Sequence, residues 1–210
     1  MTTTYILQQY VDMKDSYESI LNLANGGLIR SRDLKALGIP SVALTRLVRR
    51  GLLTHIGRGL YAHPNRAASE HASLAEVSSQ YPQAIICLLS ALRIHDVTTQ
   101  APFEVWLAIP NKARAPKMDY PPLRTLRFSG DALIEGIEEL QVDGVTLRVT
   151  NLARTVADCF KFRNKIGLDV ALEALQESWR SKRVTMDELW RYAKLCRVAN
   201  VMRPYLESLS

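Results

Sequence analysis

Cysteine is scarce in this sequence of 210 residues. The three that occur, Cys87, Cys159 and Cys196, are odd in number and widely separated, with no CxxC pair and no histidine at ligand spacing. A structural zinc site needs four ligands at short, regular spacings. We therefore expect no metal site and predict that the three cysteines are buried thiols.

Long apolar runs are also missing. No segment approaches the roughly 18 residues of a membrane span, and the start of the chain, Met1-Thr-Thr-Thr-Tyr5, lacks the charged-then-apolar order of a signal peptide. The hydrophobic fraction of 47% is typical of a folded globular protein. We expect a cytoplasmic protein with one large or two modest domains, and no membrane partner.

Motifs of the common enzyme classes are not found. The segment Gly57-Arg58-Gly59 lacks the Gly-Lys-Ser/Thr of a phosphate-binding loop, Ser90 lacks the glycines of a nucleophile elbow, and the histidines follow no HExxH spacing. A restriction-type nuclease needs an acidic residue and a nearby lysine on one strand, but Glu104-Val105-Trp106 lacks that lysine. We predict a non-enzymatic protein without cofactor or catalytic metal.

Charge is distributed unevenly along the chain. Lys and Arg outnumber Asp and Glu by 9 to 4 in residues 1–66 and by 10 to 6 in residues 161–210, but are outnumbered by 11 to 8 in residues 67–160. Between Ile29 and Arg66, eight cationic residues are opposed by Asp33 alone. This density is expected of a phosphate-binding module, although a solvated basic face would give the same counts.

The apolar spacing of the first third predicts three helices. Residues 17–24 carry one apolar stripe, residues 32–37 form a short helix with Ser31 as the expected N-cap, and a longer helix opens at Pro40-Ser41 and ends at Gly51. A short helix, a tight turn and a longer helix is the order of a helix-turn-helix.

The third predicted helix has two different faces. On a helical wheel Leu44, Leu47 and Val48 share one sector, whereas Val42 and the three arginines of this helix occupy the other. After it, residues 52–56 and 60–62 are strand-like and are joined by Gly57-Arg58-Gly59, so we expect a hairpin with a cation at its tip. Three helices and a hairpin also occur in protein-binding modules, but the charge favours a DNA-binding wing.

We predict that the residues contacting DNA lie on the second helix, on the third helix and at the hairpin tip. They are Arg30, Arg32, Lys35, Ser41, Val42, Thr45, Arg46, Arg49, Arg50 and Arg58. In helix-turn-helix proteins the early residues of the second helix of the motif face base edges. Ser41, Val42, Thr45 and Arg46 are therefore expected to read sequence, and the later arginines to reach phosphates.

The remainder of the chain predicts a mixed α+β domain. Residues 69–77 read as a linker helix capped by Ser69, and residues 84–92 are apolar enough to be a buried strand running into a helix. The expected strands are 103–109, 123–128, 140–142 and 145–149, and the expected helices are 152–162, 168–180, 186–196 and 201–209, with N-caps at Asn151 and Thr185. The proposed boundaries are 1–66 for the winged helix, 67–82 for the linker and 83–210 for the α+β domain.

One stretch of the second domain is unusually regular. Between Thr150 and Phe160, Arg154 and Asp158 are four residues apart, as in a helical ion pair. A surface salt bridge of little energetic weight is one interpretation. The other is a face that meets a partner, together with a basic strip of Lys161, Arg163 and Lys165.

Several of these segments resemble the AbiEi antitoxins of type IV toxin-antitoxin systems. The N-terminal likeness lies in Leu47-Val48-Arg49-Arg50-Gly51-Leu52-Leu53 followed by Gly57-Arg58-Gly59-Leu60-Tyr61. Further similar segments are Leu89-Ser90-Ala91-Leu92 with His95, Arg154-Thr155-Val156-Ala157-Asp158-Cys159 and Lys165-Ile166-Gly167-Leu168-Asp169. The order of these segments along the chain is more specific than any one of them.

The resemblance implies an antitoxin encoded beside a nucleotidyltransferase-like toxin, in systems linked to phage defence by abortive infection. It also implies an N-terminal domain that binds and represses its own promoter, and a C-terminal domain needed for antitoxicity. Two readings from other classes stay open. The α+β domain could be the sensor of a ligand-responsive winged-helix regulator, or the protein could be a DNA-processing enzyme that uses Glu104.

The hairpin tip yields a testable prediction. A cation between two glycines is poorly placed for packing and well placed for a phosphate or the minor groove, so Arg58→Ala should weaken DNA binding. Surface substitutions usually change stability by less than about 0.5 kcal/mol, so the melting temperature should stay nearly unchanged. Binding titrations and thermal melts check both parts, and a large loss of stability would make Arg58 a structural residue instead.

Overall fold

The computed structural model describes residues 16–57, 59–66 and 69–209. Contacts divide them into two compact units. The N-terminal unit runs to Gln80 and includes Gln141–Thr146, and the C-terminal unit contains Tyr81–Leu140 and the residues from Leu147 onward. Among the described helices, none combines the length and the apolar character that crossing a membrane requires.

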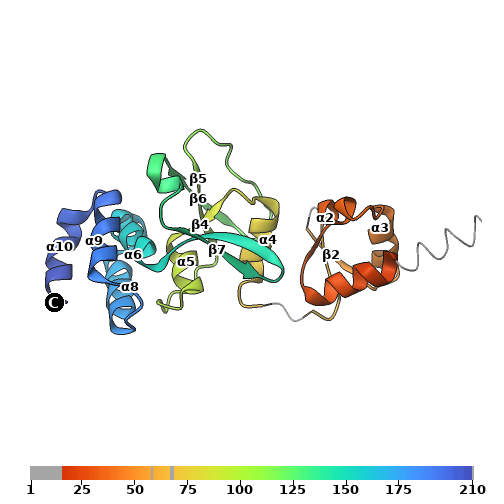
Figure 1. Cartoon of the computed structure of the whole chain (residues 1–210), viewed down its shortest axis with the longest axis horizontal. Coiled ribbons are helices and arrows are strands. Elements are labelled where there is room, and N and C mark those ends of the chain that lie inside the picture. The colour runs from red at the N-terminus through yellow and green to blue at the C-terminus, as the bar shows by residue number, and fades with distance from the viewer. Residues whose placement is uncertain (1–15, 58, 67–68, 210) are drawn as a thin grey trace, which may run out of the picture. The chain divides into compact units, whose positions relative to one another are not determined.

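The N-terminal unit is a winged helix-turn-helix, as predicted (Figure 1). After a helix at residues 16–26, its elements are β1 (Ile29–Arg30), α2 (Ser31–Ala36), α3 (Val42–Arg49), β2 (Thr54–Gly57), β3 (Leu60–Ala62) and α4 (Ala72–Gln80). The wing hairpin β2–β3 pairs antiparallel. A strand that the sequence analysis missed, β1, adds to the other side of β3, where Ile29 pairs with Tyr61.

Both helices of the motif end in the same way, and the sequence explains why. The N–H of Gly38 donates to the Lys35 carbonyl and the N–H of Ile39 to the Leu34 carbonyl, and Gly51 and Leu52 repeat this pattern at the end of α3. These bonds are a Schellman motif, which places its glycine in the left-handed region. The φ angles of Gly38 and Gly51 are +72° and +70°, so any other residue would strain the turn.

Two predicted N-caps are wrong. The chain leaves β1 in an extended conformation, so the N-cap position of α2 falls on Arg30, and Ser31 becomes the first helical residue. The linker helix α4 begins at Ala72 rather than after Ser69, whose hydroxyl donates a hydrogen bond to the Asp143 carboxylate at 2.6 Å. No side chain caps α2, and the Ser69 hydroxyl bonds to Asp143 instead of to the start of α4.

The C-terminal unit is mixed α+β, as predicted. Its described strands form a five-stranded sheet in the order β6-β5-β4-β8-β7. These are β4 (Ile85–Ile86), β5 (Val105–Pro110), β6 (Leu123–Phe128), β7 (Ile137–Val142) and β8 (Val145–Thr150). Strands β5 and β6 are parallel, as are β4 and β8, while β4 and β5 are antiparallel.

The helices of this unit gather at one side of the sheet (Figure 1). They are α5 (Leu88–Ile94), the 3-10 turn η1 (Gly130–Leu133), α6 (Leu152–Lys161), α7 (Arg163–Ile166), α8 (Leu168–Arg180), α9 (Met186–Leu195) and α10 (Ala199–Glu207). The apolar run at residues 84–92 is therefore a buried strand, β4, that leads into α5.

Local signals placed several elements of this unit correctly. Asp143 and Gly144 have φ angles of 55° and 75°, the pair of positive values that a two-residue type I′ hairpin requires. The Asn151 side chain accepts a hydrogen bond from the Arg154 N–H and caps α6, and Thr185 forms a capping box with Glu188 at the start of α9. Both predicted caps are confirmed.

Helix α6 is the centre of this unit. Every residue from Leu152 to Phe160 is buried, and its apolar side chains join one core with the inner face of the sheet and with α8, α9 and α10. A surface helix normally keeps a polar face toward water. Here the polar residues of the helix are inside the protein, and they need internal partners.

Candidate functional site

The exposed face of α3 is the strongest candidate for a nucleic-acid interface. Ala43, Leu44 and Leu47 are 0 to 5% exposed and pack in the N-terminal core. The residues on the opposite face of the helix and at its ends are exposed, namely Ser41, Val42, Thr45, Arg46, Arg49 and Arg50. The predicted division of this helix into an apolar and a basic face is confirmed.

The dimensions and chemistry of this face suit the major groove. Eight residues make a helix about 12 Å long, and an α-helix fits the major groove of B-DNA. An arginine can donate two hydrogen bonds to guanine, and a valine or threonine methyl can contact the thymine methyl. Val42 is 54% exposed, so its methyl groups are accessible for such a contact.

Arg50 is held in place by a contact that the sequence analysis missed. Its guanidinium carbon lies 5.6 Å from the centre of the Tyr17 ring. Such a cation-π contact restrains the arginine without neutralising its charge. Tyr17 was predicted only as part of an apolar stripe, since nothing in the local pattern indicates a contact across more than thirty residues.

The cations around α2 differ in their surroundings. Arg32 and Lys35 are exposed, but the Asp33 carboxylate lies 2.6 Å from the Arg30 Nε and 3.8 Å from the Arg32 Nε. Within the same unit Arg66 is ion-paired with Asp143. We expect Arg30 to contribute less to phosphate binding than the exposed Arg49, because Asp33 already offsets the charge of Arg30.

The wing carries a further part of the predicted interface. The His55 and Tyr61 rings pack across the hairpin with their centres 5.1 Å apart, and Ile56 on β2 is 41% exposed. Arg58, the predicted tip cation, lies outside the described residues. Gly59 beside it has a φ of +69°, which fits the predicted tight turn.

Comparison with known proteins points to one family. Residues 18–64 match the family model described as transcriptional regulator, AbiEi antitoxin. The predicted resemblance to the AbiEi antitoxins is confirmed over this segment. It contains α2, α3 and the wing, and therefore the whole of the candidate interface that is described. No curated protein matches the chain.

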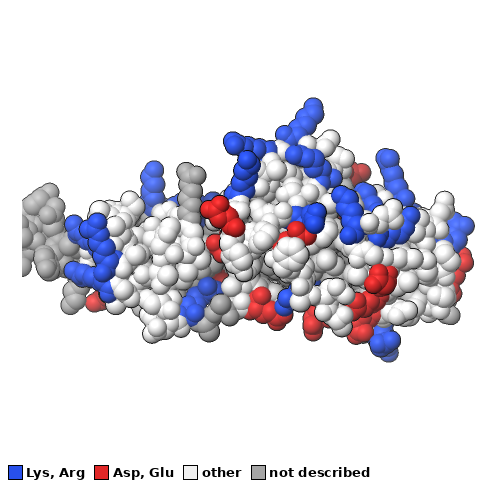
Figure 2. Space-filling model, turned by 180° about the vertical axis from the view of Figure 1, so that it is seen from behind, with Lys and Arg blue, Asp and Glu red and all other residues white. Residues whose placement is uncertain are grey.

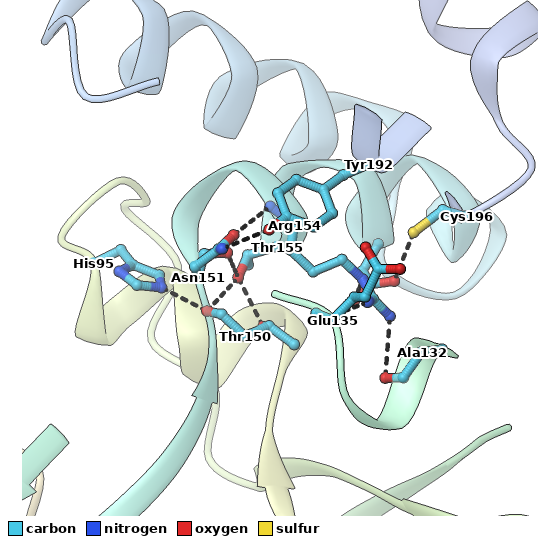
Figure 3. Close-up of polar contacts among 10 residues, drawn as sticks. His95, Ala132, Glu135, Thr150, Asn151, Arg154, Thr155, Tyr192 and Cys196 are labelled. Atoms are coloured by element: carbon cyan, nitrogen blue, oxygen red, sulfur yellow. Dashed lines mark hydrogen bonds and ion pairs between the residues drawn. The ribbon is translucent and has the colours of Figure 1, made fainter. Parts of the chain in front are cut away.

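In the C-terminal unit, the predicted ion pair forms but its predicted position is wrong. The Arg154 Nε lies 3.0 Å from an Asp158 carboxylate oxygen, and both side chains are 0% exposed (Figure 3). Neither residue can belong to a surface salt bridge or meet a partner directly. The spacing correctly predicted the pair, but it carries no information on burial, which is set by the elements packed around α6.

Arg154 and Asp158 are satisfied by groups distant in sequence (Figure 3). Arg154 donates to the carbonyl oxygens of Glu135 and Ala132, at 2.9 and 3.5 Å, and its guanidinium carbon lies 5.4 Å from the Phe128 ring centre. The Cys196 thiol donates to Asp158 at 3.2 Å. Burial raises the pKa of the Asp158 carboxyl, and the adjacent Arg154 guanidinium acts against that shift.

The three cysteines are buried, as predicted. Burial raises the pKa of each thiol, and the nearby Asp158 carboxylate raises it further. Thiols in this state are poor nucleophiles and poor metal ligands. Among the described residues, no group of three or more His, Cys, Asp or Glu is arranged to hold a metal ion.

The predicted basic strip after α6 is brought together only in part. Lys161 and Lys165 are exposed, and their ammonium nitrogens lie 5.7 and 5.9 Å from the centre of the Phe162 ring. Arg163 is half-buried instead, and it donates to the Phe160 carbonyl oxygen at 2.9 Å. The surface feature is therefore a pair of lysines over one aromatic ring.

A polar cavity of about 310 Å³ lies near the start of α6. It is lined by His95, Glu138, Asn151, Leu152, Ala153, Arg183 and Glu188. The His95 Nε2 donates to the Thr150 carbonyl oxygen at 2.7 Å (Figure 3). Burial lowers the pKa of His95 and so favours the neutral ring, and the bond to a carbonyl oxygen places a proton on Nε2.

The α3 face yields a prediction about sequence reading. Arg46→Ala should weaken binding to the protein's own promoter by about 1 to 3 kcal/mol if Arg46 contacts guanine, and should affect random DNA much less. Fluorescence anisotropy with the two duplexes measures the difference. Arg180→Ala is the matched control, since Arg180 is an exposed helical arginine of the other unit. Equal losses on both duplexes would make Arg46 a phosphate contact.

The buried ion pair yields a prediction about stability. Asp158→Ala should lower the free energy of unfolding by about 3 to 5 kcal/mol, because it leaves the Arg154 charge buried without its carboxylate. Urea unfolding followed by tryptophan fluorescence reports on the correct unit, since Trp106, Trp179 and Trp190 all belong to it.

Two further variants complete this test. Glu177→Ala removes the exposed ion pair with Arg180 and should cost less than about 1 kcal/mol. Arg154→Met combined with Asp158→Leu removes both charges and should be more stable than Asp158→Ala. A loss below 1 kcal/mol for Asp158→Ala would contradict the role assigned to the pair.

Proposed function

We propose that this protein is the antitoxin of a type IV toxin-antitoxin system, and that it binds and represses its own operon promoter. The toxin would be a nucleotidyltransferase-like protein encoded nearby, as the family resemblance implies. The protein acts without catalysis in this account. The proposed partners are double-stranded operator DNA and, functionally, the toxin.

The exposed basic face of α3 is the observation that carries the proposal. It combines accessible arginines, accessible methyl groups and a rigid helix in the segment that matches the antitoxin regulators. Arg30, whose charge Asp33 offsets, precedes α2 and is not part of this face. Because phosphate contacts release counterions, binding should weaken steeply as salt concentration rises.

The C-terminal unit is proposed to supply the antitoxic activity. Its exposed lysine pair, Lys161 and Lys165, is the part of the predicted set that a partner can reach. Arg154 and Asp158 would act only indirectly, by stabilising α6, which ends at Lys161 and is followed by α7 with Lys165. This assignment holds both for direct binding of the toxin and for an indirect reversal of its effect.

One observation favours a second function, a ligand-responsive regulator. The cavity beside His95 is large enough for a small molecule, and it presents both acidic and basic side chains. A compound that raises the melting temperature and changes promoter affinity would support this alternative. The change should disappear in an Arg183→Ala variant, since Arg183 lines the cavity.

The proposal predicts that two pairs of substitutions separate the two activities. The full-length protein with Arg46→Ala and Arg49→Ala should lose repression of a promoter reporter, yet still rescue growth when the toxin is expressed from an independent promoter. Lys161→Ala with Lys165→Ala should do the reverse. Each pair removes two exposed cations from one helix region, so each is the charge-matched control of the other.

Three results would overturn parts of this proposal. Normal repression by the Arg46 and Arg49 variant would remove DNA binding from α3. Loss of rescue in that variant, at normal abundance, would show that protection depends on DNA binding. If the wild-type protein fails to rescue, the antitoxin assignment is wrong and the ligand-responsive regulator becomes the better account.

A further inference from the structure

Two aromatic side chains of the C-terminal unit are unusually exposed. Phe103 is 80% and Tyr120 is 72% exposed. Aromatic side chains normally contribute large buried areas to cores and interfaces, so two of them in solvent indicate a surface that binds something. Neither residue belongs to the α3 interface or to the lysine pair beside Phe162.

The sheet places these two residues at the same edge. Strands β5 and β6 are parallel, and Val105 pairs with Leu123. Phe103 lies two residues before Val105, and Tyr120 lies three residues before Leu123. Since paired parallel strands start side by side, the two rings flank the amino-terminal ends of neighbouring strands.

Cations gather on the loop that connects these strands and on β6 itself. Five of the eight Lys and Arg residues in the otherwise acidic segment 67–160 fall between residues 112 and 127, where the single acidic residue is Asp119. All five are exposed, namely Lys112, Arg114, Lys117, Arg124 and Arg127. The loop arches over the sheet in Figure 1, and Figure 2 shows Lys and Arg side chains gathered along the corresponding upper edge of the molecule.

The loop backbone is held by hydrogen bonds to Arg127 and Tyr81. Arg127 donates to the Ala113 carbonyl oxygen at 2.9 Å. The Tyr81 hydroxyl donates to the Lys117 carbonyl oxygen at 2.6 Å and accepts from the Lys117 N–H at 3.0 Å. These bonds use main-chain groups of the loop, and they leave the lysine side chains available to a ligand.

Arg124 links the cations to the aromatic end of this edge. It forms an ion pair with Glu104 at 2.9 Å, and its guanidinium carbon lies 5.4 Å from the Trp106 ring centre, yet its side chain is 57% exposed. The edge therefore offers two open rings at one end and a row of cations beyond them. Measured along β6, which has six residues, this surface is about 20 Å long.

We propose that this edge binds single-stranded nucleic acid. Unpaired bases would stack on Phe103 and Tyr120, and the phosphates that follow would lie along Lys112, Arg114 and Lys117. Proteins that bind single strands combine aromatic platforms with a basic track in this way. In a duplex the faces of the bases are covered by stacking, so the exposed rings of Phe103 and Tyr120 could not stack on them. An acidic protein partner would be bound by the cations and would not require the two rings.

The test uses the full-length chain carrying Arg46→Ala and Arg49→Ala, so that binding through α3 is weakened. Labelled 15-nucleotide oligo-uridine, oligo-thymidine and a duplex of unrelated sequence are titrated by fluorescence anisotropy. In this background Phe103→Ala and Tyr120→Ala should each weaken single-strand binding about tenfold, as expected for the loss of one base stack. Ile134→Ala is the matched control, because Ile134 is 76% exposed in the same unit, and it should change affinity less than twofold.

The outcomes separate this inference from its alternatives. Binding of either oligo-uridine or oligo-thymidine supports the proposal. Tighter binding of one of them identifies whether the site prefers RNA or DNA. Unchanged affinity in both aromatic variants, or equal binding of the duplex, overturns it. A change from dimer to monomer in light scattering on Phe103→Ala, without a loss of affinity, would instead make this edge an interface between two copies. The growth-rescue assay tests the antitoxin proposal separately, since failure of either leaves the other standing.

Discussion

The buried guanidinium of Arg154 is the constraint on which the C-terminal unit depends. A charge inside a protein is tolerated only where other groups replace the water that it has lost. Here three groups do so: the Asp158 carboxylate on the same helix, and the carbonyl oxygens of Glu135 and Ala132 on the segment before β7. Helix α6 and that segment must therefore be assembled together.

Close packing around this network adds a second requirement. A Cβ on Gly136 would lie 2.8 Å from the Tyr192 ring and 3.0 Å from the Arg154 Cβ, and Gly136 has a φ of +68°. The Tyr192 hydroxyl in turn accepts a hydrogen bond from Asn151, the N-cap of α6. The absence of a side chain at Gly136 thus lets α9, α6 and the segment before β7 approach each other. The hydrogen bond between Tyr192 and Asn151 then holds the start of α6 in place.

Arginines in the two units have different roles, one in stability and the other in ligand binding. Arg154 is satisfied inside the protein and stabilises it, whereas Arg46 and Arg49 extend from α3 into solvent on a helix whose other face is core. Exposed arginines add little to stability. Their concentration on one short helix is better explained by a polyanionic ligand, and the match of this segment to antitoxin regulators agrees with DNA as that ligand.

Local chemistry made some elements predictable from sequence. Glycines that end α2 and α3, the Asp143-Gly144 turn and the capping box at Thr185 all act over a few residues, and each was placed correctly. Features that depend on distant contacts were missed. The strand β1 forms only because β3 offers an edge, and Arg154 is buried only because α8, α9 and the sheet surround α6.

The same distinction applies to the candidate site. The amphipathic pattern of α3 was sufficient to identify its exposed basic residues, because a helical wheel is a local property. Nothing local showed that Tyr17 would contact Arg50. The ion pair between Arg30 and Asp33 is local, because the two residues are three apart, but it was not predicted. The aromatic edge was also missed, since the exposure of Phe103 and Tyr120 depends on where two parallel strands begin.

The central claim is that the exposed face of α3 meets DNA. Backbone amide chemical shifts of the labelled full-length protein, recorded while duplex from the upstream region is added, test it most directly. The account predicts that the largest changes fall between Ser41 and Arg50 and in the wing, with small changes at buried residues of α6. Changes confined to the C-terminal unit, with α3 unaffected at saturating duplex, would contradict it.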